Sequence, residues 1–151
     1  MSNRATGERL LASYRKTEAL LRGALEEKPD CPDLIAQLGK AIALQGRTED
    51  ALECYLASLE IDPAQPGLLI RTGDLYAGEG CFEEALRFYE HYQQLCPERA
   101  RGYRKMGDSL LVQEYIWSAA DAYSLALDRE PNNPELRDRL DKTVELCLMD
   151  F

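Results

Sequence analysis

Apolar residues recur at helical spacing through most of the chain, and this spacing predicts an all-α fold. The first stretch, residues 3 to about 28, carries one apolar stripe made of Leu10, Leu11, Tyr14, Leu21, Ala24 and Leu25. The same spacing predicts further helices at residues 32–45, 48–60, 66–79, 82–95, 100–113 and 116–129. Residues 134–149 complete the set as an amphipathic closing helix, whose apolar positions are Leu136, Leu140, Val144 and Leu148.

The same residue types return every 34 positions along these predicted helices. The prolines are Pro29, Pro63, Pro97 and Pro131, the glycines are Gly39, Gly73 and Gly107, the alanines are Ala51, Ala85 and Ala119, and the tyrosines are Tyr55, Tyr89 and Tyr123. Several columns that agree at one period indicate an internal repeat of helix-turn-helix units.

Each repeated residue type has a physical role in such a unit. The glycine lets the two helices approach closely, the alanine is small at the same crossing, and the tyrosine is expected to pack across to the next unit. The proline ends the second helix, because its ring clashes with a continuing helix. Gly46 and Gly80 form the turns of the first two units, whereas the third unit carries Glu114 there. Its second helix is therefore expected to begin less clearly.

The period, the small pair, the aromatic and the proline resemble the tetratricopeptide repeat (TPR) family. The resemblance implies a right-handed superhelix of stacked units. It divides the chain into an N-terminal partial repeat or cap at residues 1–31, three units at 32–65, 66–99 and 100–133, and a C-terminal capping helix at 134–151. Stacked repeats need such caps, because an open end exposes apolar surface.

Composition and charge narrow the class of protein. The 151 residues carry a formal net charge of −9, whereas a nucleic-acid-binding protein needs a basic surface. The N-terminus lacks the hydrophobic core of a signal peptide. Five cysteines at long spacings and one histidine, His91, give little support to a disulfide framework or a zinc site. We therefore expect a cytoplasmic protein with reduced thiols and without membrane insertion.

Catalytic motifs are absent from the sequence. It holds no phosphate-binding glycine loop, no nucleophile motif and no metal-ligand pattern. We therefore expect a protein that is not an enzyme and that uses no cofactor or metal.

The resemblance implies that the first helix of each unit lines a concave groove. The groove side chains are expected to include Gln37, Lys40, Arg71, Asp74, Arg101, Arg104, Lys105 and Asp108. The four from the third unit share one helix face, because their spacing is i, i+3, i+4 and i+7. Arginine can grip a carboxylate with two hydrogen bonds, so the groove is expected to bind a peptide that carries acidic groups. The alternative is a set of ordinary solvated charges, some of them paired with the two aspartates.

Some TPR co-chaperones grip the terminal carboxylate of heat-shock chaperone tails with lysine, asparagine and arginine side chains. The matching positions of this chain hold Ala36, Lys40, Arg71, Arg101 and Lys105. Only the third unit agrees in charge type, so a general site for acidic peptides is favoured over a true chaperone-tail clamp.

A second interface is predicted around Trp117, with Tyr115 and Phe151. The counterparts of Trp117 in the other units are Glu49 and Glu83, so its face is expected to be exposed, and tryptophan is common in interface hot spots. The alternative is that Trp117 packs on Tyr115 or on the closing helix.

The leading interpretation is therefore a non-catalytic interaction module, or adaptor, whose groove holds a segment of a partner protein. Small acidic proteins with three TPR units also resemble the chaperones of type III secretion, so a chaperone for a secreted client is a second possibility. A self-assembling scaffold is a third, in which the groove of one copy takes an end of another.

Overall fold

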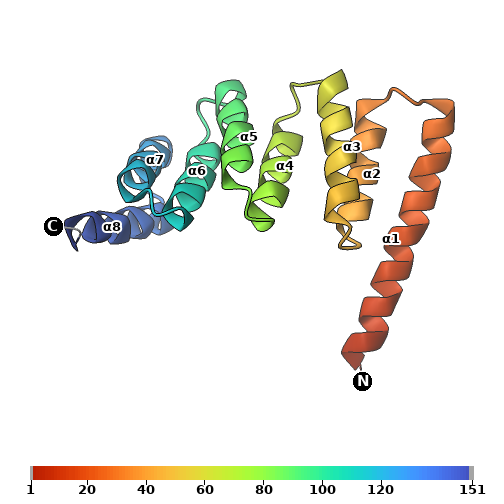
Figure 1. Ribbon diagram of the computed structural model, residues 1–151, viewed down its shortest axis with the longest axis horizontal. Helices are drawn as coiled ribbons and strands as arrows, with labels where there is room; N and C mark the ends of the chain where they lie inside the picture. Colours follow the sequence, from red (N-terminus) through yellow and green to blue (C-terminus); the bar gives the residue numbers. More distant parts are fainter. Residues whose placement is uncertain (1, 150–151) are drawn as a thin grey trace. The chain divides into compact units, whose positions relative to one another are not determined.

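The computed structural model describes residues 2–149, which form eight α-helices joined by short turns (Figure 1). The helices are α1 (Ser2–Glu27), α2 (Pro32–Ala43), α3 (Thr48–Ile61), α4 (Pro66–Gly78), α5 (Phe82–Leu95), α6 (Arg101–Val112), α7 (Ile116–Arg129) and α8 (Pro134–Met149). The described residues contain no strand, and the all-α prediction is confirmed. None of these eight helices is long and apolar enough to cross a membrane.

The chain divides into two compact units, residues 1–68 and 69–151, with the boundary inside α4. The first unit holds α1, α2, α3 and the start of α4. The second holds the rest of α4 and the helices α5 to α8.

Prolines set the limits of most helices. The helices α1, α3, α5 and α7 each end two residues before a repeated proline, because the proline disfavours helical backbone in the residue that precedes it. Pro32, Pro66 and Pro134 occupy the first position of α2, α4 and α8, where the missing N–H costs nothing.

The turn of the third repeat adopts the same backbone conformation as the other two turns. Gly46 and Gly80 have φ angles of 78° and 79°, and Glu114 has a φ of 63°. The expectation that the second helix of this unit begins less clearly is wrong, since α7 begins at Ile116, in register with the starts of α3 and α5. The packing of the flanking helices holds Glu114 in a left-handed conformation that glycine adopts more easily.

The repeated tyrosine packs on the repeated glycine of its own unit. A Cβ atom added to Gly39, Gly73 or Gly107 would come within 2.5–2.7 Å of the ring of Tyr55, Tyr89 or Tyr123, the tyrosine 16 residues later. The bare glycine backbone offers the ring a flat surface within the unit, and Tyr89 also lines a cavity with Lys105 and Asp108 of the next unit.

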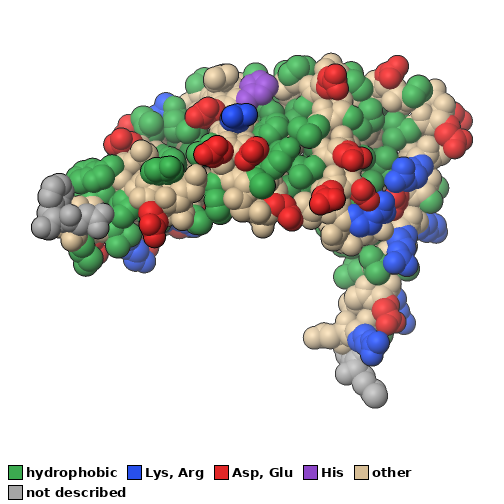
Figure 2. Space-filling model, in the orientation of Figure 1, with side chains coloured by type: hydrophobic (Ala, Val, Ile, Leu, Met, Phe, Trp, Pro, Cys, Tyr) green, Lys and Arg blue, Asp and Glu red, His purple; other side chains and the backbone are tan. Residues whose placement is uncertain are grey.

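Charge is unevenly distributed over the first unit, where Lys and Arg side chains gather along α1 (Figure 2).

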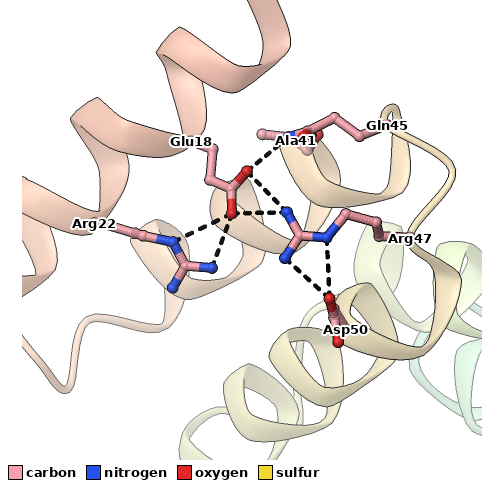
Figure 3. A network of polar contacts seen from close by, with 6 residues as sticks. All are labelled: Glu18, Arg22, Ala41, Gln45, Arg47 and Asp50. Atoms are coloured by element: carbon pink, nitrogen blue, oxygen red, sulfur yellow. Dashed lines mark hydrogen bonds and ion pairs between the residues drawn. The ribbon is translucent and has the colours of Figure 1, made fainter. Parts of the chain in front are cut away.

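One carboxylate on α1, that of Glu18, joins this helix to the turn between α2 and α3 (Figure 3). It accepts hydrogen bonds from Gln45 at 2.8 Å and from Arg22 at 2.8 Å. It also accepts two from Arg47 at 3.0 Å, and Arg47 in turn pairs with Asp50 at 2.9 Å. The network fixes the position of α1 along α2.

Candidate functional site

A tyrosine–aspartate–cation contact occurs twice in the second unit. The Tyr89 hydroxyl donates a hydrogen bond to Asp74 Oδ1 at 2.7 Å, and Lys105 Nζ lies 2.8 Å from the same oxygen. One repeat later, the Tyr123 hydroxyl donates to Asp108 Oδ1 at 2.6 Å, and Arg139 pairs with that oxygen. The first contact joins both helices of one repeat to the first helix of the next, and the second joins both helices of the third repeat to α8.

These contacts set the protonation state of the two tyrosines and the ion pairs of three predicted groove residues. Burial, and then the hydrogen bond to the aspartate, raises the pKa of both tyrosines, so the hydroxyls stay protonated donors. Lys105, Asp74 and Asp108 lie together at a cavity of about 480 Å³ that Phe82 and Val112 also line. Each of these three charges has an ion-pair partner inside the protein. Pairing with Asp74 and Asp108 is what the alternative to a peptide-binding groove expected for some of the predicted residues.

A second cavity of about 270 Å³ holds the arginines at the start of α6. Arg99, Arg101 and Arg104 line it together with Glu130, Tyr92, Ala100 and Leu136. Within residues 2–149, neither Arg101 nor Arg104 has an ion-pair partner. Arg99 pairs only with its neighbour Glu98, at 3.6 Å and in solvent, a contact that contributes little. We call Arg99, Arg101 and Arg104 the arginine cluster.

The arginine cluster sits on a loop held by a buried side chain. Gln93 Nε2 donates to the carbonyl oxygens of Cys96, Pro97 and Arg99 at 3.1, 3.3 and 2.8 Å. The Oε1 atom of Gln93 packs so closely on Gly102 that a Cβ there would lie 2.4 Å away. Gln93 on α5 therefore positions both the backbone of Arg99 and the start of α6.

Three predicted groove residues line neither cavity. Gln37 and Lys40 are exposed on α2, in the first unit, and Arg71 is exposed on α4 in the second. Lys40 occupies the register position that Asp74 and Asp108 hold in the later repeats. The two contacts described above therefore have no counterpart at this position.

The predicted second interface is partly described. Tyr115 and Trp117 lie at the α6–α7 turn with side chains 58% and 59% exposed, so the expected exposure of Trp117 is found. Phe151 lies outside the described residues.

Two side chains of this candidate site, Arg99 and Arg139, were not predicted from the sequence. Arg99 precedes α6, and the helical register does not include the loop. Arg139 lies 34 positions after Lys105, so the same period would have identified it as the cation for Asp108.

No family model and no curated protein matches the chain. Solved structures do match it. The first TPR domain of Spaghetti (RPAP3), solved with the HSP90 peptide SRMEEVD, is 22% identical with a TM-score of 0.69, over 78% of this chain and 93% of that one. MamA is 17% identical with a TM-score of 0.81, over 91% and 81%. The Sgt2 TPR domain from Aspergillus fumigatus is 21% identical with a TM-score of 0.66, over 77% and 78%.

These similarities establish the fold. The chain has the helix-turn-helix fold of TPR proteins, and the resemblance found in the sequence is confirmed at that level.

Proposed function

We propose that this protein is a non-catalytic interaction module that binds an acidic segment of a partner protein, with the arginine cluster as the centre of the site. The observation that carries the proposal is the pair of cations, Arg101 and Arg104, that line one cavity without an ion-pair partner in the described chain. In a protein of net charge −9, such a cluster is a local positive site that attracts a negative ligand.

The size of the cavity supports recognition of one acidic group at a time. A volume of about 270 Å³ accommodates a carboxylate and its side chain. The planar guanidinium fork can hold such a group through two parallel hydrogen bonds. Tyr92 and Leu136 supply apolar wall area for the methylene groups of a glutamate. The single carboxylate in the lining, Glu130, disfavours a ligand that brings many negative charges into the cavity itself.

A peptide whose acidic groups lie in sequence would extend from the cavity along the exposed face of the second unit. Arg71 is a further exposed cation on that unit, and we assign it to the outer part of the same site. The RPAP3 domain, with the same fold, was solved with the peptide SRMEEVD, whose last four residues include three acidic ones, and this supports an acidic ligand. Five free thiols support a cytoplasmic location as part of the proposal.

The test is a binding titration with labelled peptides followed by fluorescence anisotropy. One peptide ends in glutamate and aspartate residues, and its control has glutamine and asparagine at the same positions. We expect binding of the acidic peptide alone, and weaker binding as salt rises, because salt screens exposed charges. Arg104→Glu should weaken binding at least tenfold, in line with about 1.5–3 kcal/mol for a hydrogen bond to a charged group.

Arg87→Glu is the matched control, since Arg87 is exposed on α5 and the change in net charge is the same. Equal effects of the two substitutions would show that binding depends on the net charge of the protein and not on the arginine cluster. Equal binding of the acidic and neutral peptides would contradict the proposal. Preference for an apolar segment would favour the chaperone for a secreted client instead.

A further inference from the structure

The turn between α6 and α7 differs from the two equivalent turns in what it exposes. Val112, Tyr115 and Trp117 are 64%, 58% and 59% exposed. The equivalent residues are Leu44, Arg47 and Glu49 in the first repeat and Gly78, Cys81 and Glu83 in the second. Only the third repeat places two exposed aromatic side chains here, and it does so at a turn that carries the left-handed Glu114. We call Val112, Tyr115 and Trp117 the turn patch.

A cavity lies at the same turn, lined by the residues on either side of Tyr115. Leu111, Ile116 and Leu146 line it with apolar atoms, Glu114 adds a carboxylate, and its volume is about 470 Å³. Because Leu146 lines this cavity, the C-terminal part of α8 lies beside the turn. The cavity is therefore large enough for one or two aliphatic side chains, and its lining includes one negative charge.

The N-terminal part of α1 is a helix that extends beyond its neighbour in the first unit. The helix has 26 residues and α2 has 12, and the end of α2 is fixed beside Glu18 by Gln45. Leu10 lies eight residues before Glu18, about 12 Å further along the axis. We call residues 2–16 the α1 extension. Figure 1 shows it running past the ends of α2 and α3.

The α1 extension is apolar on one side and basic overall. Leu10 continues the stripe that Tyr14, Leu21 and Leu25 begin nearer to α2, and its side chain is 49% exposed. Residues 2–16 hold four cations, Arg4, Arg9, Arg15 and Lys16, and one carboxylate, Glu8. A free helix of this length is marginally stable in water, so the α1 extension gains stability when its stripe is covered.

We propose that the α1 extension of one copy docks on the turn patch of a second copy, with Leu10 in the cavity beside Glu114. The two surfaces complement each other in apolar side chains and in charge. One offers aliphatic side chains flanked by arginines, and the other offers a cavity lined by Leu111, Ile116, Leu146 and the Glu114 carboxylate, at a turn with exposed aromatic side chains. The proposal is independent of acidic-peptide binding, because it uses no member of the arginine cluster.

Charge repulsion disfavours a symmetrical dimer in which two α1 extensions pack on each other. Two α1 extensions packed on each other would bring together two sets of four cations with only one carboxylate each, and like charges repel. The contact between an α1 extension and a turn patch joins two different surfaces. In a dimer held by one such contact, one α1 extension and one turn patch remain unoccupied. Further copies can therefore add to form longer assemblies, or the assembly closes into a ring.

The test uses two variants with defects on opposite surfaces. Leu10→Glu damages the α1 extension. Tyr115→Arg with Trp117→Glu damages the turn patch and introduces the residues that the first repeat carries at Arg47 and Glu49. Leu20→Glu is the control, because Leu20 is also exposed on α1 but projects about 100° round the helix from Leu21. Circular dichroism checks that every variant is folded.

Sedimentation velocity of the full chain measures the outcome. The parent protein and Leu20→Glu should form species larger than a dimer as concentration rises. Each defective variant should be monomeric by itself, and an equimolar mixture of the two should form a dimer and nothing larger, since one intact contact remains. A monomeric parent protein at about 100 μM, where weak small interfaces are occupied, would overturn the proposal, and so would a mixture that stays monomeric.

Discussion

The ring of Tyr89 lies against Gly73 so closely that a Cβ on this glycine would stand 2.5 Å from a ring carbon. The hydroxyl of the same tyrosine reaches Asp74, the residue after the glycine. One side chain thus fixes both the distance between α4 and α5 and the position of a charged group on α4. The same pairing recurs at Gly107 and Tyr123, which explains why these residue types return at the repeat period.

Replacing this glycine should destabilise the protein. Gly73→Ala forces the buried ring of Tyr89 to move, and overpacking of this kind costs about 1–3 kcal/mol. The better helix propensity of alanine offsets only about 1 kcal/mol. Gly78→Ala is the control on the same helix, because nothing lies within 4 Å of its Cβ position. Thermal unfolding should show a lower midpoint for the first variant and an unchanged or higher one for the second.

The third turn should become more stable with glycine. Glu114 holds a φ of 63°, and left-handed backbone costs a residue with a side chain roughly 1 kcal/mol. Glu114→Gly should raise the free energy of unfolding by about that amount, and Gly80→Ala should lower it comparably, since the φ of Gly80 is 79°. Chemical denaturation measures both. A destabilised Glu114→Gly variant would show that the carboxylate has a stabilising partner.

The attachment of α1 should weaken in acid. Hydrogen bonds from Gln45 and from the guanidinium groups of Arg22 and Arg47 lower the pKa of Glu18 from 4.5 to about 2. The folded state therefore favours the charged carboxylate. Its contribution is fully present above pH 4.5 and is lost as the pH falls towards 2.

Glu18→Gln tests this pH dependence. At pH 7 the variant should lose about 1 kcal/mol of unfolding free energy, and the difference from the parent protein should shrink to nothing near pH 2. Glu26→Gln is the control on the exposed end of the same helix. A constant difference at all pH values would contradict a role for the Glu18 charge.

Gln93 should affect peptide binding without touching the peptide. Gln93→Leu removes three hydrogen bonds to the loop that carries Arg99. The arginine cluster should then lose its fixed geometry, and the acidic peptide should bind more weakly while its salt dependence stays the same. Unchanged affinity in a folded Gln93→Leu variant would show that the loop keeps its position without Gln93.

The sequence predicts the helices closely because prolines and apolar spacing act locally. The start of α7 was misjudged, since tertiary packing holds Glu114 in a conformation that its residue type disfavours. Local patterns also leave the partners of charged groups open. Lys105 and Arg104 are adjacent in the sequence, yet one pairs with Asp74 and the other lines a cavity with Arg101. Adjacent helical residues project about 100° apart, and the position of α4 beside α6 decides that Lys105 meets Asp74.

The central claim is that an acidic segment binds at the arginine cluster, and nuclear magnetic resonance can locate the binding site directly. The acidic peptide is titrated into ¹⁵N-labelled protein, and the backbone amide shifts of all residues are followed. We predict the largest changes from Arg99 to Arg104 and at Leu136, which line one cavity. Changes centred on any other part of the chain, with the amides of Arg99–Arg104 unaffected, would contradict the account.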